Sequence, residues 1–260
     1  MKLSLSGRLV EAGGGTILGT GEFVDLAARC GYDAVDLRAT QLAPETPAAE
    51  VDALRAALAS CGVGVFEGQW HGGASQRSEA FSAVAALLAE LGAEAVRVGG
   101  DLPALKQLAR AAARHGLRAV YQMHTGGAFQ TIRSAAEAIA EIDEPNFGVL
   151  PEPANLLLAG EAFAEDMFEP LAGHVFGVHV QTLEARPDAP DAVRLADGTD
   201  VHYARVPYAE NRQIDFVTFF AALRRAGFDG CVNELEPCPG PDALEETVRE
   251  AAAFLRPLVT

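Results

Sequence analysis

The chain has 260 residues, 49% of them hydrophobic, and a formal net charge of −16. This length suits one large domain or two small ones, and the hydrophobic share supplies a core that needs no disulfides. The acidic balance argues against sequence-independent binding of nucleic acid, which requires Lys and Arg beside phosphates, but it leaves room for a small anionic ligand at a local basic spot.

The N-terminal residues lack the continuous apolar segment and the small-residue cleavage site of a secretory signal. No apolar run approaches the length of a membrane span. The four cysteines form no CxxC pair and show no zinc-finger spacing. We therefore expect reduced thiols and a cytoplasmic protein with neither a nucleic-acid partner nor a membrane partner.

Short apolar runs recur along the chain and predict strands at 3–5, 34–37, 63–66, 95–98, 119–121, 147–150, 175–180 and 231–235. Segments with helical periodicity lie between them, at 22–29, 48–59, 79–91, 101–114, 131–142, 216–226 and 241–258. Several of these segments stop at a glycine suited to a left-handed helix cap, such as Gly62 and Gly116.

Eight strands that alternate with helices predict an α/β fold, a (β/α)8 TIM barrel forming a single domain over residues 1–260. A doubly wound open sheet is the alternative. The strand count and the lack of a GxGxxG motif after the first strand favour the barrel. The exception to the regular spacing is the segment 181–215, rich in Pro and Asp, which includes Arg205. We expect this segment to be a functional loop that contacts substrate.

Polar residues gather where the later strands end. Gln122 and His124 lie two residues apart on an extended strand, so they point to the same side. The next three strands add five more groups that could bind a cation or a substrate, and these lie at Glu152 and Asn155, His179 and Gln181, and Glu234. In a closed barrel these strand ends form the mouth where chemistry takes place. Two carboxylates, an imidazole and an amide oxygen suit Mn²⁺ or Mg²⁺, with Zn²⁺ or Co²⁺ tolerated.

Each of these residues also has a structural interpretation, since a polar strand end is often solvated and His179 could be a core histidine. Trp70, after the third strand, is expected either to cover a substrate or to pack on the barrel rim. Arg97 lies inside the fourth strand, where a buried guanidinium is expected to pair with Asp36 or Glu67.

The chain resembles the xylose isomerase-like TIM-barrel family, which includes sugar isomerases, ketose 3-epimerases, hydroxypyruvate isomerase and inosose dehydratase. The resemblance rests on GYDAVDLR at 31–38, QIDFVTFFAALRRAGFDG at 213–230 and the acid-Pro-x-Asn-Leu pattern that begins at Glu152. It implies a metal held by Gln122, Glu152, His179 and Glu234. Gln122 stands where the family has Glu, and Glu152 stands where it has Asp.

Gln122 in place of Glu removes one negative charge from the implied site. Three carboxylates, a neutral histidine and a divalent ion sum to −1, whereas the set in this chain sums to zero. We therefore expect weak metal binding, because ligand charge tunes affinity at oxygen sites. A two-base epimerisation is also disfavoured, since an amide cannot act as a base and only Glu234 of the two expected bases remains.

The implied chemistry is metal-assisted proton transfer beside a carbonyl, through an enediolate. Glu234 would take the proton, His124 would return it or protonate a leaving hydroxyl, and Glu152 would complete the catalytic set. The substrate, a small sugar or polyol, would contact Gln122, Asn155, Gln181, Trp70 and Arg205. The resemblance thus predicts a sugar isomerase or epimerase, with an inosose-type dehydratase and a non-catalytic sugar-binding or accessory subunit as alternatives. A homodimer is compatible with it.

Overall fold

The computed structural model describes residues 1–72 and 78–260. Within these residues, eight parallel strands form the central sheet in the order β8-β7-β6-β5-β4-β1-β13-β9. Their bounds are β1 (Lys2–Ser6), β4 (Ala34–Leu37), β5 (Gly64–Gln69), β6 (Ala95–Arg97), β7 (Arg118–Gln122), β8 (Phe147–Leu150), β9 (Val178–Val180) and β13 (Cys231–Glu234). A parallel bridge from Val149 to Val175, just before β9, brings the two edge strands together, so the sheet nearly closes into a barrel.

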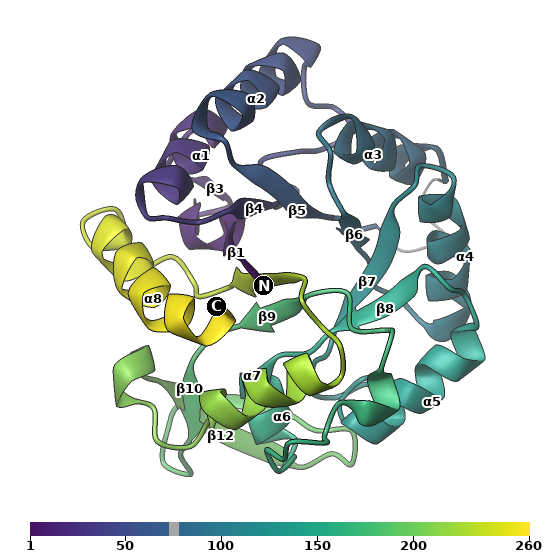
Figure 1. The fold of residues 1–260 in the computed structure, drawn as a ribbon, viewed down its shortest axis with the longest axis vertical. Helices are drawn as coiled ribbons and strands as arrows, with labels where there is room; N and C mark the ends of the chain where they lie inside the picture. Colours follow the sequence, from purple (N-terminus) through teal and green to yellow (C-terminus); the bar gives the residue numbers. More distant parts are fainter. Residues whose placement is uncertain (73–77) are drawn as a thin grey trace.

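Helices surround this sheet, as Figure 1 shows. They are α1 (Thr20–Arg29), α2 (Ala48–Cys61), α3 (Ser78–Glu90), α4 (Leu102–Ala113), α5 (Ile132–Ile142), α6 (Pro153–Leu158), α7 (Phe216–Arg225) and α8 (Leu244–Val259). Local signals fix their ends: Asp101 caps α4 by accepting from the N–H of Ala104 at 2.9 Å, and α2 stops at Gly62, whose φ is +67°. The predicted α/β barrel is confirmed.

The segment 181–215 differs from the expected irregular loop. It contains a three-stranded antiparallel sheet made of β10 (Leu183–Ala185), β12 (Asp200–Arg205) and β11 (Asp191–Arg194). A tight turn at Gly198, with φ at +88°, joins β11 to β12. The sequence ADG between two alternating stretches is a hairpin signal, so this sheet could have been found from the sequence.

Other small elements also follow the barrel strands. The 3-10 helix η1 (Gly7–Val10) and a hairpin of β2 (Glu11–Ala12) and β3 (Gly15–Thr16) come after β1. Further 3-10 turns are η2 (Glu169–Leu171) and η3 (Tyr208–Glu210).

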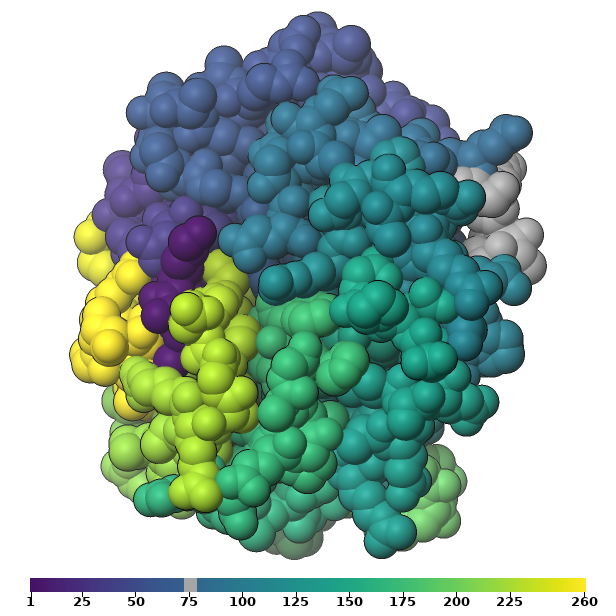
Figure 2. Space-filling model, turned by 45° about the vertical axis from the view of Figure 1, so that its right-hand side comes forward, coloured from purple at the N-terminus to yellow at the C-terminus, as the bar shows by residue number. Residues whose placement is uncertain are grey.

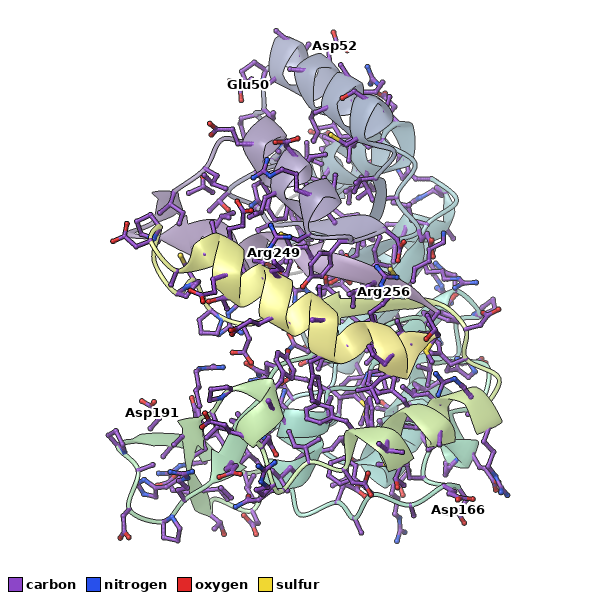
Figure 3. All side chains as sticks on the ribbon, turned by 60° about the vertical axis from the view of Figure 1, so that its left-hand side comes forward. Glu50, Asp52, Asp166, Asp191, Arg249 and Arg256 are labelled. Atoms are coloured by element: carbon purple, nitrogen blue, oxygen red, sulfur yellow. The ribbon has the colours of Figure 1, made fainter. Side chains whose placement is uncertain are left out.

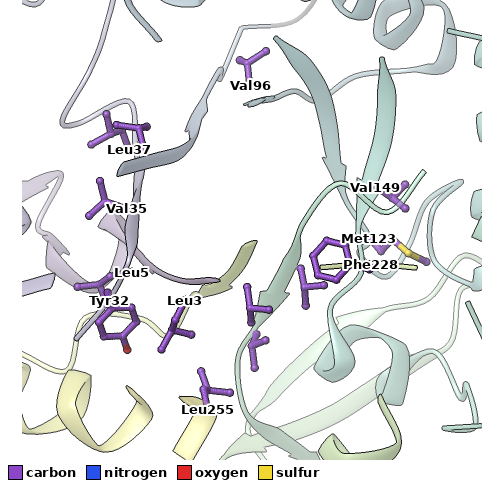
Figure 4. Close-up of a cluster of buried hydrophobic side chains, with 14 of the residues drawn as sticks. Leu3, Leu5, Tyr32, Val35, Leu37, Val96, Met123, Val149, Phe228 and Leu255 are labelled. Atoms are coloured by element: carbon purple, nitrogen blue, oxygen red, sulfur yellow. The ribbon is translucent and has the colours of Figure 1, made fainter. Parts of the chain in front are cut away.

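The apolar core has two parts. The larger part fills the space between strands and helices, and Figure 4 shows Leu3, Val35 and Leu255 from β1, β4 and α8 within it. The smaller part lies inside the barrel and comprises Ala34, Phe66, Ala95, Val120, Leu150 and Cys231. Because side chains alternate along a strand, residues two positions further along these strands form the next layer towards the mouth.

The N-terminal and C-terminal segments of the chain lie side by side. β1 pairs with β13, and the N-terminal amine donates to the carbonyl of Val259 at 3.1 Å. In Figure 2 the purple N-terminal segment accordingly lies against the yellow-green and yellow C-terminal part.

Acidic side chains such as Glu50, Asp52, Asp166 and Asp191 lie at the periphery of the molecule (Figure 3). In the part of the chain that the structure describes, no helix combines the length and the apolar character needed to cross a membrane.

Candidate functional site

A polar layer lies directly above the apolar layer inside the barrel. Five of the six residues that lie two positions after the members of the smaller core are polar, and these are Asp36, Arg97, Gln122, Glu152 and Asn233. All of them except Gln122 are buried, and Gln122 is half-buried. Burial of so many polar groups is costly unless they are hydrogen-bonded, and this layer is accordingly a connected network.

A cavity of about 360 Å³ opens above this layer, at the carboxyl ends of the strands. Its polar lining consists of Arg8, Arg38, Gln69, Arg97, Gln122, His124, Asn155, Gln181, Tyr203 and Arg205. Leu158, Leu183, Val193 and Leu235 supply apolar surface. The volume and the mixed lining suit a small molecule that carries several polar groups.

Glu152 is the acceptor beneath this cavity, and it is fully buried. Its Oε2 accepts hydrogen bonds from the side-chain amides of Gln122 and of Asn155, the latter at 2.8 Å. Its Oε1 accepts from the amide of Gln181. Three amides that line the cavity therefore converge on one carboxylate, which fixes their oxygen atoms in position.

The two glutamines connect Glu152 to arginines. Gln122 Oε1 accepts from Arg97 Nη1 at 3.3 Å. Gln181 Oε1 accepts from Arg205 Nη1 at 3.0 Å and from Arg8 Nη1 at 3.4 Å. Each amide thus stands between a carboxylate and a guanidinium and forms a hydrogen bond with each.

His179 lies in the same interior but has a different partner. Its Nε2 is 2.7 Å from Oε1 of Glu67, and both side chains are fully buried. Burial raises the pKa of Glu67 to about 7 and, with Arg97 as the second cause, lowers the pKa of His179 to about 3. The histidine is therefore neutral in the folded protein at ordinary pH. Arg97 Nε is 3.9 Å from the same Glu67 oxygen, so the expected pairing of Arg97 is with Glu67 rather than Asp36.

Glu234 points away from the cavity. Its neighbour Asn233 faces the interior, where it donates to Asp36 at 3.3 Å, and Leu235 lines the cavity. Glu234, between them, points to the opposite side of the strand, and its charge is among the causes that raise the pKa values of Tyr32 and Tyr208. Burial, followed by the nearby Glu236, raises the pKa of Glu234 itself well above its ordinary value.

The four residues expected to bind a metal do not fit a common ion. Gln122 and Glu152 are bonded to each other, His179 is bonded to Glu67, and Glu234 lies on the other side of its strand. Across residues 1–72 and 78–260, no group of three or more His, Cys, Asp or Glu side chains is arranged to hold a metal ion. No reaction step is therefore derived through a metal.

The other expected residues lie as follows. His124 is exposed at the cavity, and its Nδ1 lies 3.1 Å from the carbonyl oxygen of Thr125 and 3.2 Å from Oγ1 of the same residue. Trp70 lines two adjoining hollows rather than the main cavity and packs edge-on against Phe81. Arg205 reaches the cavity from β12 and also binds Glu236 at 3.0 Å.

Sequence reasoning missed Arg8. It comes from η1, just after β1, and it lines the cavity as Arg38 does from the end of β4. Arg38 binds Glu11 at 3.0 Å. Both arginines follow the end of an apolar strand, the same signal that identified Gln122 and Gln181, so strand-end position alone would have found them.

Comparisons with known proteins agree with the barrel fold. A family model described as "xylose isomerase-like TIM barrel" matches residues 24–258. A comparison with curated proteins gives no match.

Solved structures share the fold over almost their whole length. A D-psicose 3-epimerase from Clostridium cellulolyticum H10, solved with D-tagatose, is 12% identical, with 100% of this chain and 99% of that chain covered and a TM-score of 0.74. A xylose isomerase domain protein from Alicyclobacillus acidocaldarius is 23% identical, with 99% and 98% covered and a TM-score of 0.72. The probable 3-DHS dehydratase AsbF from Bacillus anthracis is 14% identical, with 98% and 99% covered and a TM-score of 0.77.

Proposed function

The chain belongs to the xylose isomerase-like TIM-barrel family, and from that premise we propose that its cavity binds a small sugar or polyol derivative and moves a proton at the carbon beside its carbonyl group. Structural neighbours in this fold include a sugar 3-epimerase and a dehydratase. The observation that carries the proposal is the cavity itself: His124 lies at its wall, and three amides held by one buried carboxylate form its floor.

In this proposal His124 is the catalytic acid and base. In the tautomer whose Nδ1–H donates to the Thr125 carbonyl, 3.1 Å away, Nε2 carries a free lone pair and can take a proton from carbon. The electron pair of the C–H bond then moves onto the carbonyl oxygen and gives an enediolate. The second N–H of the Gln122 amide and of the Gln181 amide, beside the one given to Glu152, would stabilise that oxygen, because donors already fixed in place need no reorganisation.

The position to which His124 returns the proton decides the product. Return of the proton to the neighbouring carbon gives an aldose–ketose isomerisation. Return to the same carbon, on the face opposite to the one that lost the proton, gives an epimer. Delivery to a β-hydroxyl that leaves as water gives a dehydration. The isomerase or epimerase reaction is our first choice and the dehydration is the alternative. Glu152 acts as a positioning residue, because it is fully buried beneath the amides.

A second function, binding without turnover, is favoured by one specific feature. Gln122 replaces a potential base by an amide, and Glu234, the other expected base, points away from the cavity. His124 is then the cavity group that we propose for proton transfer. A sugar-binding or accessory subunit needs no such group.

The deciding experiment follows exchange of carbon-bound hydrogen in heavy water. D-fructose, D-psicose, D-tagatose and an inosose are each incubated with the protein, with and without Mn²⁺ and after EDTA, and proton NMR records deuterium uptake and new products. Deuterium at the carbon beside the carbonyl, lost in His124→Gln and kept in His202→Gln, supports the enzyme. His202 is a suitable control because it is exposed on β12 and does not line the cavity. Binding with no exchange in any of these sugars would favour the binding role.

A further inference from the structure

The cavity is basic although the chain as a whole is strongly acidic. Four arginines line it, contributed by separate segments, while the net charge of the chain is −16. Bringing guanidinium groups together has a cost. The pKa of Arg8 is lowered from its ordinary value, first by burial and then by the neighbouring Arg205.

Two of the four arginines have close carboxylate partners. Arg38 Nε is 3.0 Å from Glu11 Oε2, and Arg205 Nη1 is 3.0 Å from Glu236 Oε2. These two pairs are charge-compensated within the protein.

Arg8 and Arg97 are held mainly by neutral oxygens. Arg8 Nη1 donates to the carbonyl of Leu235 at 3.0 Å and to the amide oxygen of Gln181. Arg97 Nη1 donates to the amide oxygen of Gln122. The amides of Gln181 and Gln122 lie between these guanidiniums and the carboxylate of Glu152, so Glu152 makes no direct pair with either arginine.

Of these two arginines, Arg97 gives the stronger evidence that an anion binds here. Its side chain is 5% exposed, and its nearest carboxylate oxygen, on Glu67, lies 3.9 Å from Nε and is already bonded to His179. Among the described residues, its Nε and Nη2 have no hydrogen-bond partner. A buried guanidinium with unused donors is costly unless an anion completes it.

We propose that the ligand of this cavity carries an oxyanion, a carboxylate or a phosphate, which Arg8 and Arg97 bind. This inference rests on the proposed function for the rest of the ligand, a hydroxylated carbon skeleton. The planar fork of arginine donors matches both oxyanions in geometry. Leu158, Leu183 and Leu235 leave apolar surface for the carbon atoms.

The test compares a neutral sugar with charged relatives by isothermal titration calorimetry. The probes are D-fructose, D-fructose 6-phosphate, D-glucuronate and inorganic phosphate. We expect at least one anionic probe to bind about tenfold or more tightly than D-fructose, and its affinity to fall with added salt. The relative affinities of D-glucuronate and D-fructose 6-phosphate show whether the oxyanion is a carboxylate or a phosphate. Equal or weaker binding of all the anionic probes would overturn the inference.

Variants locate the charge that binds the ligand. Arg8→Gln is expected to weaken the anionic probe about tenfold or more and to leave D-fructose nearly unchanged. Arg97→Gln removes the charge of the second arginine, and Arg97→Lys keeps the charge but loses the planar fork of donors. Thermal unfolding shows whether each variant is folded, so Arg97→Lys serves as the test if Arg97→Gln misfolds. The control is Arg133→Gln, which makes the same change of net charge at a side chain that is 90% exposed on α5. An equal loss of affinity for D-fructose and for the anion in Arg8→Gln would contradict the assignment.

This outcome is separable from that of the hydrogen-exchange experiment. Anion binding that depends on Arg8 but brings no carbon exchange would uphold the anion site and remove the enzyme proposal. Exchange in neutral D-fructose, with no preference for anions, would do the reverse.

Discussion

Gln122 and Glu152 are joined by a hydrogen bond in which the side-chain amide donates to the carboxylate. With Glu at position 122, two carboxylates would meet here and repel each other unless a cation lay between them or one of them bound a proton. The amide makes the contact favourable without either, because it gives Glu152 a donor and gives Arg97 an acceptor. The side-chain amide of Gln122 thus connects Glu152 to Arg97 in this part of the cavity.

The first prediction concerns Gln122→Glu. This change places like charges side by side and removes a donor to a buried carboxylate, so the variant without metal should be less stable by about 1–3 kcal/mol. Mn²⁺ should raise its unfolding temperature more than that of the unchanged protein. Differential scanning fluorimetry with and without Mn²⁺ measures both effects. The control is Gln69→Glu, a second glutamine that lines the same cavity. If Mn²⁺ raised the unfolding temperature of the unchanged protein by as much, the side-chain amide of Gln122 would be compatible with a bound metal and the prediction would be wrong.

The second prediction sets Glu152 against Glu234. Glu152→Gln places an amide N–H₂ against donors of Gln122, Asn155 or Gln181, and it should lower the free energy of unfolding by about 1–3 kcal/mol. Glu234→Gln removes a buried carboxyl whose pKa is raised by burial, so it should leave stability at neutral pH unchanged or higher. Ligand binding in the cavity should survive in Glu234→Gln. Urea unfolding orders the two variants, and a larger loss of stability in Glu234→Gln would contradict the assigned orientations.

The third prediction is a pH dependence at Asp36. Burial, followed by the charge of Glu67, raises the pKa of this fully buried carboxyl. The folded state therefore holds the proton to a higher pH than the unfolded state does, and stability falls as the pH rises from the ordinary carboxyl pKa to the raised one. Asp36→Asn keeps oxygen acceptance from Ser6 and should lack this fall. Urea unfolding of both proteins over a pH series should show the gap closing at acid pH. Parallel curves would contradict the raised pKa.

The fourth prediction concerns His124, once a substrate is identified. His124→Gln should lower kcat by about 10²–10⁴-fold and change KM little, because the lost group moves a proton but contributes little to binding. Steady-state kinetics, with His202→Gln as the control, measures the split. A rise in KM with an unchanged kcat would make His124 a binding residue instead.

The sequence located much of this site. Gln122, His124, Asn155 and Gln181 were identified as strand-end residues, and the structure brings all four to one cavity. The reason is that alternation along a strand and the barrel topology together bring the polar strand ends to the same mouth. Arg205 was also identified, although the antiparallel sheet that carries it was expected to be a loop.

One feature depended on the three-dimensional arrangement. The last strand offers Asn233 and Glu234 in succession, and a shift of one residue in register exchanges the side chains that face inward and outward. The nearly closed sheet places Asn233 against Asp36 inside the barrel, so Glu234 points to the opposite side of the strand.

The sequence by itself determined the alternating strands and helices, the barrel and the polar residues at its mouth, because hydrophobic periodicity and helix caps are local signals. Only the tertiary structure decided which of those residues meet. Glu67 and His179 are 112 positions apart, and Glu152 binds amides from two other strands. Such pairings depend on strand register and barrel closure, which bring distant segments within hydrogen-bond distance and line the cavity with amides and arginines.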